Sequence, residues 1–157
     1  MLRKGDNEPM IAVVQRVLNA KVHVKLPHYQ ASIESGLCVF LGIHTSDTQS
    51  QAIWMANKLA NLRIFNDDND KMNCSLLETG GGILLISQFT LVGDCMKGHR
   101  PSFIRAAPPA SAAPLVTEVG DILTNQHGIS VKRGVFGAMM QVELVNDGPV
   151  TLIIHRD

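Results

Sequence analysis

The sequence has no excess of charge of either sign. Lysine and arginine together number 14, aspartate and glutamate also number 14, and the isoelectric point lies near pH 7.0. Proteins that coat DNA or RNA usually carry a basic face and a high isoelectric point. The balance excludes a footprint spread along a nucleic-acid backbone, so any contact with nucleic acid is expected to be small. A net charge near zero also removes a barrier to self-association.

The sequence also lacks paired cysteines and long apolar runs. Its three cysteines, at positions 38, 74 and 95, form no Cys-X-X-Cys motif, which is typical of free thiols in a reducing compartment. The longest apolar runs, such as residues 37–43, fall far short of the roughly 20 residues that span a membrane. Residues 1–9 are polar and do not resemble a secretory signal. We therefore expect a cytoplasmic protein with no membrane partner.

What remains is the composition of one globular domain. With 157 residues, 45% of them apolar, the chain can form a core without disulfides or metal. We expect residues 1–9 to be a disordered N-terminal extension and residues 10–157 to form the domain.

Apolar periodicity predicts two helices and about seven strands, with strands at the end of the chain. This order favours a compact α/β domain in which two β-sheet layers carry about two helices packed on one side. Asp47 or Thr48 is the expected N-cap of the first helix. The predicted helices are 48–62 and 111–126, and the predicted strands are 11–17, 21–24, 31–33, 37–43, 83–89, 139–145 and 150–154, with a further short strand at 63–65.

Polar side chains interrupt an apolar run at the end of predicted strand 83–89. Ser87, Gln88 and Thr90 flank Phe89 there, and the end of a buried strand holds such groups in fixed directions. The same residues also suit the ordinary start of a loop. No base is adjacent in the sequence to activate Ser87 or Thr90 as a nucleophile.

Two further segments contain candidate binding residues. Asp147-Gly148-Pro149 suits a turn between strands, although this proline removes a backbone donor and a Gly-Pro bond can be cis. Residues 95–105 hold three cations and a histidine without an acid. This composition suits a segment that binds a phosphate or a terminal nucleotide. It is equally typical of an ordinary solvated loop.

No segment predicts a metal site or another cofactor. Cys95 and His99 supply two of the three or four ligands that zinc requires, and the other histidines are scattered singly. The acidic turn at 66–70 lacks the glycine and the glutamate that complete a calcium loop. We therefore expect a protein that works without a cofactor.

Several motifs, in this order, resemble one known family. SQFTL (87–91) and NDGPVT (146–151), at this separation, are specific to D-aminoacyl-tRNA deacylases, and the resemblance runs from Met10 to about His155. The other matching segments are IAVVQRV (11–17), NLRIFND (61–67), KMN (71–73), KGHRPSF (97–103), AAPP (106–109) and GVFGAMMQVELVNDGPVTL (134–152).

The resemblance implies a homodimeric ester hydrolase with its active site at the dimer interface. Its substrate would be aminoacyl-tRNA, from whose 3′-terminal adenosine it removes a D-amino acid or glycine, and DNA is not an implied partner. Backbone carbonyls of a cis Gly-Pro from the partner subunit would exclude L-amino acids. The implied site residues are Ser87, Gln88, Phe89 and Thr90 for catalysis, Gly148 and Pro149 for chirality, Arg16 to hold that motif, and Phe136 and Met140 around the adenosine.

Two alternatives stay open on the sequence. A deacylase of a small L-amino acid such as alanine would have a trans Gly148–Pro149 bond, and a non-catalytic RNA-binding dimer would have lost the motifs that this chain retains. The sequence departs from the family at 25–31, where an Asp-Gly-type turn is usual, and at Met139, where many members carry an acid. Whether Thr90 attacks the ester or positions other groups is also open.

Overall fold

The computed structural model describes residues 9–156 of the chain. The predicted N-terminal extension lies outside this range except for Pro9, which is buried. The elements are β1 (Ile11–Val24), β2 (Tyr29–Ile33), β3 (Gly36–Gly42), α1 (Gln49–Asn61), β4 (Phe65–Asn66), β5 (Met72–Cys74), α2 (Leu76–Thr79), β6 (Gly82–Ser87), the 3-10 helix η1 (Phe89–Val92), α3 (Pro109–Asn125), β7 (Val131–Arg133) and β8 (Gln141–His155).

One bent sheet of six strands forms the centre of the domain. The long strand β1 pairs antiparallel with β8 along one edge, and with β3 (through residues 11–17) and β2 (through residues 20–24) along the other. β6 then adds to β3 and β7 adds to β6, both in parallel. The sheet bends so far that β2 contacts β6 and β7, where the Tyr29 hydroxyl donates a hydrogen bond to the Arg133 carbonyl at 2.7 Å. The sheet therefore nearly closes on itself and supplies both predicted β layers.

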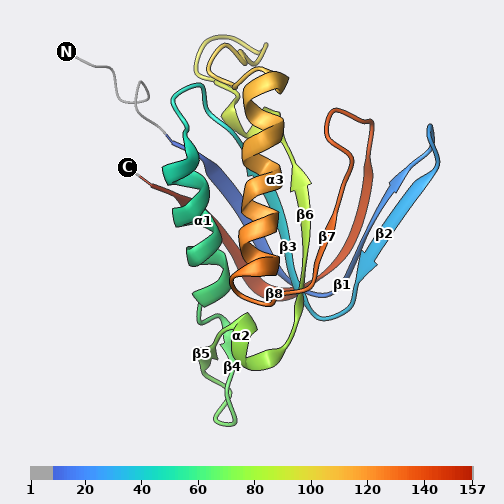
Figure 1. Cartoon of the computed structure of the whole chain (residues 1–157), viewed down its shortest axis with the longest axis vertical. Coiled ribbons are helices and arrows are strands. Elements are labelled where there is room, and N and C mark those ends of the chain that lie inside the picture. Colours follow the sequence, from blue (N-terminus) through green and yellow to red (C-terminus); the bar gives the residue numbers. More distant parts are fainter. Residues whose placement is uncertain (1–8, 157) are drawn as a thin grey trace.

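The two faces of this sheet bury two separate apolar clusters. On the outer face, α1 and α3 lie side by side across the strands, and their apolar sides pack on side chains such as Val14, Leu41 and Leu85 (Figure 1). The inner face encloses a smaller cluster that includes Val22, Cys38 and Leu84. Adjacent strand residues alternate between the clusters because successive side chains point to opposite faces.

The predicted helices form close to their expected positions because their signals are local. Thr48 is the N-cap of α1, and its N–H donates to the Gln51 side chain at 2.8 Å in a capping box. α3 starts two residues earlier than predicted, with Pro109 at its first turn, a position that proline tolerates. Gly128 follows it with a left-handed φ of 67°, as a helix-ending glycine does. The mixed α/β class is confirmed.

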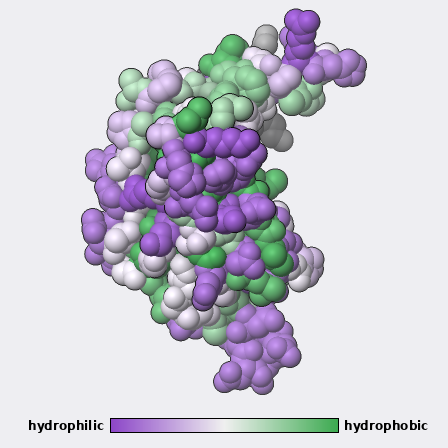
Figure 2. Space-filling model, turned by 90° about the vertical axis from the view of Figure 1, so that its right-hand side faces the viewer, coloured by the Kyte–Doolittle hydropathy of each residue, from purple (hydrophilic) through white to green (hydrophobic). Residues whose placement is uncertain are grey.

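The strands differ more from the prediction. The predicted strands 11–17 and 21–24 form one continuous β1, and β8 runs through residues 146–149, where a turn was predicted. β5, α2 and β7 were not predicted because each is only three or four residues long. β4 and β5 form a two-stranded sheet whose acidic turn is the hydrophilic projection at the bottom of Figure 2.

No helix within residues 9–156 is long and apolar enough to cross a membrane.

Candidate active site

An apolar cavity of about 580 Å³ opens beside the end of β6. Its walls come from the end of β3, the first turns of α3 and the segment 136–142 that leads into β8. Of the residues predicted for the site, the cavity is lined by Ser87, Gln88, Phe89, Phe136 and Met140. The structure thus brings together two motifs that are about fifty residues apart in the sequence.

The end of β6 fixes the backbone of the first motif. The N–H of Gln88 donates to the Leu41 carbonyl at 2.8 Å, which extends the pairing of β6 with β3 by one residue. The chain then turns into η1, where the Leu91 N–H donates to the Gln88 carbonyl at 3.2 Å. The N–H groups of Phe89 and Thr90 lie at the start of η1, and the first N–H groups of a helix have no acceptor within it.

The side chains of this motif are accessible at the rim of the cavity. Phe89 is 57% exposed, and Thr90 is exposed next to it. The Gln88 amide donates a hydrogen bond to the Thr90 hydroxyl, so the partner that the structure gives this hydroxyl is an amide and not a base. Phe136 stands at the same rim and is 39% exposed.

Met140 is held in the cavity wall by a close approach to the backbone at Gly134. A Cβ atom at Gly134 would lie 2.7 Å from the Met140 sulfur and 3.1 Å from Cδ1 of Ile86. Glycine is therefore required there for Met140 to occupy its position. Met139, by contrast, is 92% exposed at the mouth of the cavity.

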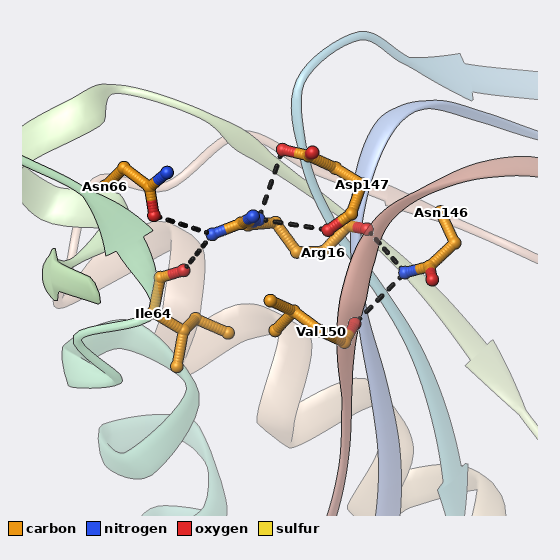
Figure 3. A network of polar contacts seen from close by, with 6 residues as sticks. All are labelled: Arg16, Ile64, Asn66, Asn146, Asp147 and Val150. Atoms are coloured by element: carbon orange, nitrogen blue, oxygen red, sulfur yellow. Dashed lines mark hydrogen bonds and ion pairs between the residues drawn. The ribbon is translucent and has the colours of Figure 1, made fainter. Parts of the chain in front are cut away.

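Arg16 organises a second cluster of polar groups, drawn in Figure 3. Its guanidinium is buried, and its Nε lies 3.1 Å from a carboxylate oxygen of Asp147 and donates to the Asp147 carbonyl at 3.2 Å. Its Nη1 donates to the Ile64 carbonyl at 2.7 Å and to the Asn66 side chain at 3.3 Å. One cation thus ties β8 to the segment that follows α1.

The groups around Arg16 stabilise a large bulge in β8. Gln15 pairs with Thr151 and Val17 with Asn146, so residues 147–150 stand opposite Arg16 alone. The Asn146 amide closes the bulge by donating to the carbonyls of Arg16 and Val150, each at 3.0 Å (Figure 3). Gly148 and Pro149 are exposed at its tip, and the bond between them is cis.

Within one chain, the residues that line the cavity lie apart from the cluster around Arg16. Arg16 pairs with Leu37 on β3, whereas Ser87 stands opposite Leu41 of the same strand. Four residues of strand correspond to about 13 Å. Neither Arg16 nor the Gly-Pro bulge lines the cavity in one chain.

Ionisable groups with shifted pKa values lie outside the cavity. Burial raises the pKa of the Cys38 thiol to about 12, which keeps it protonated. Burial also raises the pKa of Asp47, although its carboxylate accepts hydrogen bonds from the N–H groups of Met10 and His44, each at 2.7 Å. Within residues 9–156, no three His, Cys, Asp or Glu side chains come close enough together to hold a metal ion.

Sequence reasoning missed the residues that build the walls and supports of these clusters. Ala107, Pro109 and Ala112 line the cavity; the first two lie in the matching segment AAPP (106–109), but small apolar residues give no indication of a role in the site. The Ile64 carbonyl supports Arg16 through its backbone, which no side-chain pattern can indicate. Asn146 stands directly before the predicted Asp-Gly-Pro segment, and this neighbouring position could have indicated that its side chain supports the segment.

Comparison with known proteins agrees with this geometry. A family model described as D-Tyr-tRNA(Tyr) deacylase matches residues 13–155. A D-aminoacyl-tRNA deacylase of Geobacillus sp. (strain WCH70) is 52% identical over 146 residues, covering 93% of this chain and 95% of that protein. The deacylase of Thermus aquaticus is 51% identical over 145 residues, covering 92% and 94%.

Two solved structures share the fold. One titled c-Myc DNA Unwinding Element Binding Protein is 39% identical, with a TM-score of 0.86 over 94% of this chain and 99% of the other. A probable eukaryotic D-amino acid tRNA deacylase has a TM-score of 0.81 over the same shares at 16% identity, which shows the fold alone. The chain belongs to the D-Tyr-tRNA(Tyr) deacylase family, as its motifs predicted.

Proposed function

We propose that this protein hydrolyses the ester bond of D-aminoacyl-tRNA, and of glycyl-tRNA, and spares L-aminoacyl-tRNA. The observation that carries the proposal is the cavity in which the end of β6 meets Phe136 and Met140, in a chain that belongs to a deacylase family. Its size is typical of sites for small molecules and cofactors, about 300–1,000 Å³.

The cavity suits the terminal adenosine of tRNA. Its walls are mainly apolar, and Phe136 and Met140 offer an aromatic ring and a polarisable sulfur to a nucleobase. A base bound there directs its ribose and the attached ester toward Ser87 and Phe89 at the rim. The predicted site residues thereby divide into a nucleoside-binding set and a set at the reacting ester.

The chemistry requires little from side chains because an aminoacyl ester is already activated. Water attacks the acyl carbon of the ester. The N–H groups of Phe89 and Thr90 stabilise the negative charge that develops on the carbonyl oxygen of the acyl group. The bond from the acyl carbon to the ribose oxygen then breaks, and a proton from the attacking water passes to that oxygen. Hydroxyls of the ribose share in this transfer. Thr90, held by Gln88, positions these groups rather than attacking.

The Gly-Pro bulge of one subunit would complete the site of another. Gly148 and Pro149 are exposed at the tip of the bulge, and Leu18 on β1 and Val145 on β8 expose 55% and 47% of their surface. Contiguous apolar patches at the surface mark sites that a partner covers, and we take these two side chains as part of such a patch. Carbonyls of the bulge would occupy the space of an L side chain, whereas glycine has no side chain to exclude. The chain would act in the cytoplasm as a homodimer.

The first test is the loss of amino acid from tRNA charged with D-tyrosine, L-tyrosine or glycine. We expect rapid hydrolysis of the D-tyrosyl and glycyl esters and survival of the L-tyrosyl ester. Equal hydrolysis of both enantiomers would refute chiral proofreading. Hydrolysis of L-alanyl-tRNA with survival of D-tyrosyl-tRNA would instead identify a deacylase of small L-amino acids.

A second test asks whether the site is shared between subunits. Phe136→Ala damages the cavity of its own subunit, and Gly148→Val damages the bulge, since a Cβ at Gly148 would lie 2.8 Å from the Asn146 side-chain oxygen. When equal amounts of the two variants associate at random, half of the dimers contain one subunit of each variant. In such a dimer, one of the two sites combines the intact cavity of one subunit with the intact bulge of the other. Each variant alone has no intact site and should be inactive on D-tyrosyl-tRNA. Refolding the two variants together should restore about a quarter of the wild-type activity on this substrate. No recovery in proven mixed dimers would contradict a shared site.

A further inference from the structure

The loop between η1 and α3 has a defined conformation. Asp94 and Ser102 pair antiparallel through two backbone hydrogen bonds of 2.7 and 2.8 Å. The Asp94 carboxylate also accepts the Met96 N–H at 2.9 Å, and Gly98 turns the chain at the tip with a left-handed φ of 63°. Residues 94–102 therefore form a closed loop, which we name the basic loop; it lies at the top of Figure 1.

The tip of the basic loop concentrates positive charge in a chain whose net charge is zero. Lys97, His99 and Arg100 are all exposed there. Asp94 is the only acid in the loop's sequence, and its carboxylate is turned onto the loop's own backbone. The tip is a hydrophilic projection at the upper edge of the molecule (Figure 2).

The base of the loop packs against the candidate active site. Phe103, the residue after Ser102, meets the Phe89 ring edge to face, with centroids 5.3 Å apart. Gly93 permits this contact because a Cβ there would lie 2.8 Å from the Phe103 ring. Phe89 itself lines the rim of the cavity. The Phe89–Phe103 pair thus joins the base of the basic loop to the rim of the proposed nucleoside site.

We propose that the basic loop binds phosphates of the single-stranded RNA segment that precedes the terminal nucleotide of the substrate. The inference rests on the proposed function, which places the terminal adenosine in the cavity. A nucleoside bound there carries its 5′ phosphate out past the rim, and the base of the basic loop packs on Phe89 at that rim through Phe103. Lys97 and Arg100 are the lysine and the arginine of the loop, so the contact involves about two phosphates. Phosphate contacts hold the strand in position without reading its sequence.

This contact also accounts for the charge balance of the whole chain. A protein that binds only the last nucleotides of its RNA needs a few local cations and not a basic face. Each phosphate contact on a single strand steepens the fall of affinity with salt by about 0.7 in the logarithmic slope. A fourfold rise in salt, from 50 to 200 mM, then weakens binding about 2.6-fold for each contact.

The experiment compares two substrates and two matched variants. D-Tyrosyl-tRNA carries the phosphates, whereas D-tyrosyl-adenosine has the same ester and nucleoside without them. Lys97→Glu reverses one charge at the loop tip, and Lys71→Glu makes the same change in the β4–β5 turn at the opposite end of the molecule (Figure 1). For each protein, kcat/KM is measured with both substrates at 50, 100 and 200 mM salt.

We expect Lys97→Glu to lower kcat/KM for the tRNA substrate several-fold and to make its logarithmic salt slope shallower by about 0.7. Hydrolysis of D-tyrosyl-adenosine should be unchanged, and Lys71→Glu should match wild type on both substrates. An unchanged rate on tRNA would overturn the proposal. An equal loss on both substrates would also overturn it, because the loop would then act through Phe89 on the ester site.

Failure of the proposed function would be visible separately, as wild-type protein that hydrolyses neither substrate. The loop is then tested by titrating a fluorescent single-stranded RNA ending in adenosine and following its anisotropy. Weaker binding by Lys97→Glu than by Lys71→Glu supports the phosphate contact. Equal binding by the two variants overturns it.

Discussion

Replacing Arg16 by methionine should destabilise the fold and release the Gly-Pro bulge. Methionine keeps an apolar stem of similar length in the buried position but removes every donor of the guanidinium. Arg16 is 7% exposed, and it donates to two backbone carbonyls and the Asn66 side chain while pairing with the Asp147 carboxylate. All of these contacts are lost together.

The loss in the free energy of unfolding depends on how deeply each acceptor that loses its bond to Arg16 is buried. Ile64 is 8% exposed, so its unpaired carbonyl should cost about 1–3 kcal/mol. The Asp147 side chain is 43% exposed and can be solvated, so losing its ion pair costs less than the 3–5 kcal/mol of a fully buried pair. We expect the free energy of unfolding to fall by about 2–4 kcal/mol in total.

Urea denaturation at one fixed protein concentration measures this change, since the stability of the proposed dimer would depend on protein concentration. The matched control is Lys21→Met, which breaks an exposed pair with Glu143 whose side chains are 42% and 75% exposed. Such a pair contributes about 0–1 kcal/mol. A loss for Arg16→Met no greater than that for Lys21→Met would refute the bracing role of Arg16. Under conditions where the variant stays folded, D-tyrosyl-tRNA hydrolysis should also fall more than in the control.

Two further predictions concern single residues. Because the pKa of Cys38 is raised to about 12 in the folded state, its contribution to stability is complete below the ordinary value of 9.0 and is lost as the pH rises towards 12. Cys38→Ala should therefore show a smaller fall in the free energy of unfolding between pH 9 and pH 11 than wild type, measured by urea denaturation; an equal fall would contradict the shift. Gly134→Ala should raise KM for D-tyrosyl-adenosine because its Cβ displaces the Met140 sulfur. An unchanged KM would show that Met140 does not contact the nucleoside.

The sequence predicted what depends on neighbours along the chain. The N-cap at Thr48, the apolar stripes of α1 and α3, and the polar interruption at Ser87 are all local patterns, and the structure has each at or near its predicted position. The order of the motifs also identified the family, which needs no knowledge of contacts.

Other features depend on pairing between distant segments. The turn predicted at 146–149 is wrong. β1 pairs with the residues of β8 before and after this segment, so β8 continues as one strand and residues 147–150 form a bulge in it. Local composition describes a turn and a bulge alike, and only the partner strand distinguishes them.

The class of fold, the family and the polar interruption at the end of β6 could all be predicted, because they follow from short patterns and their order along the chain. Three features came from the folded chain instead: Phe136 and Met140 share a cavity with Ser87, Arg16 braces the bulge through the Ile64 carbonyl, and the cavity and the bulge are separated within one chain. These features could not be predicted because the bending and pairing of the sheet determine which distant residues meet. The register of β1 with its neighbours sets these distances, and no single segment encodes that register alone.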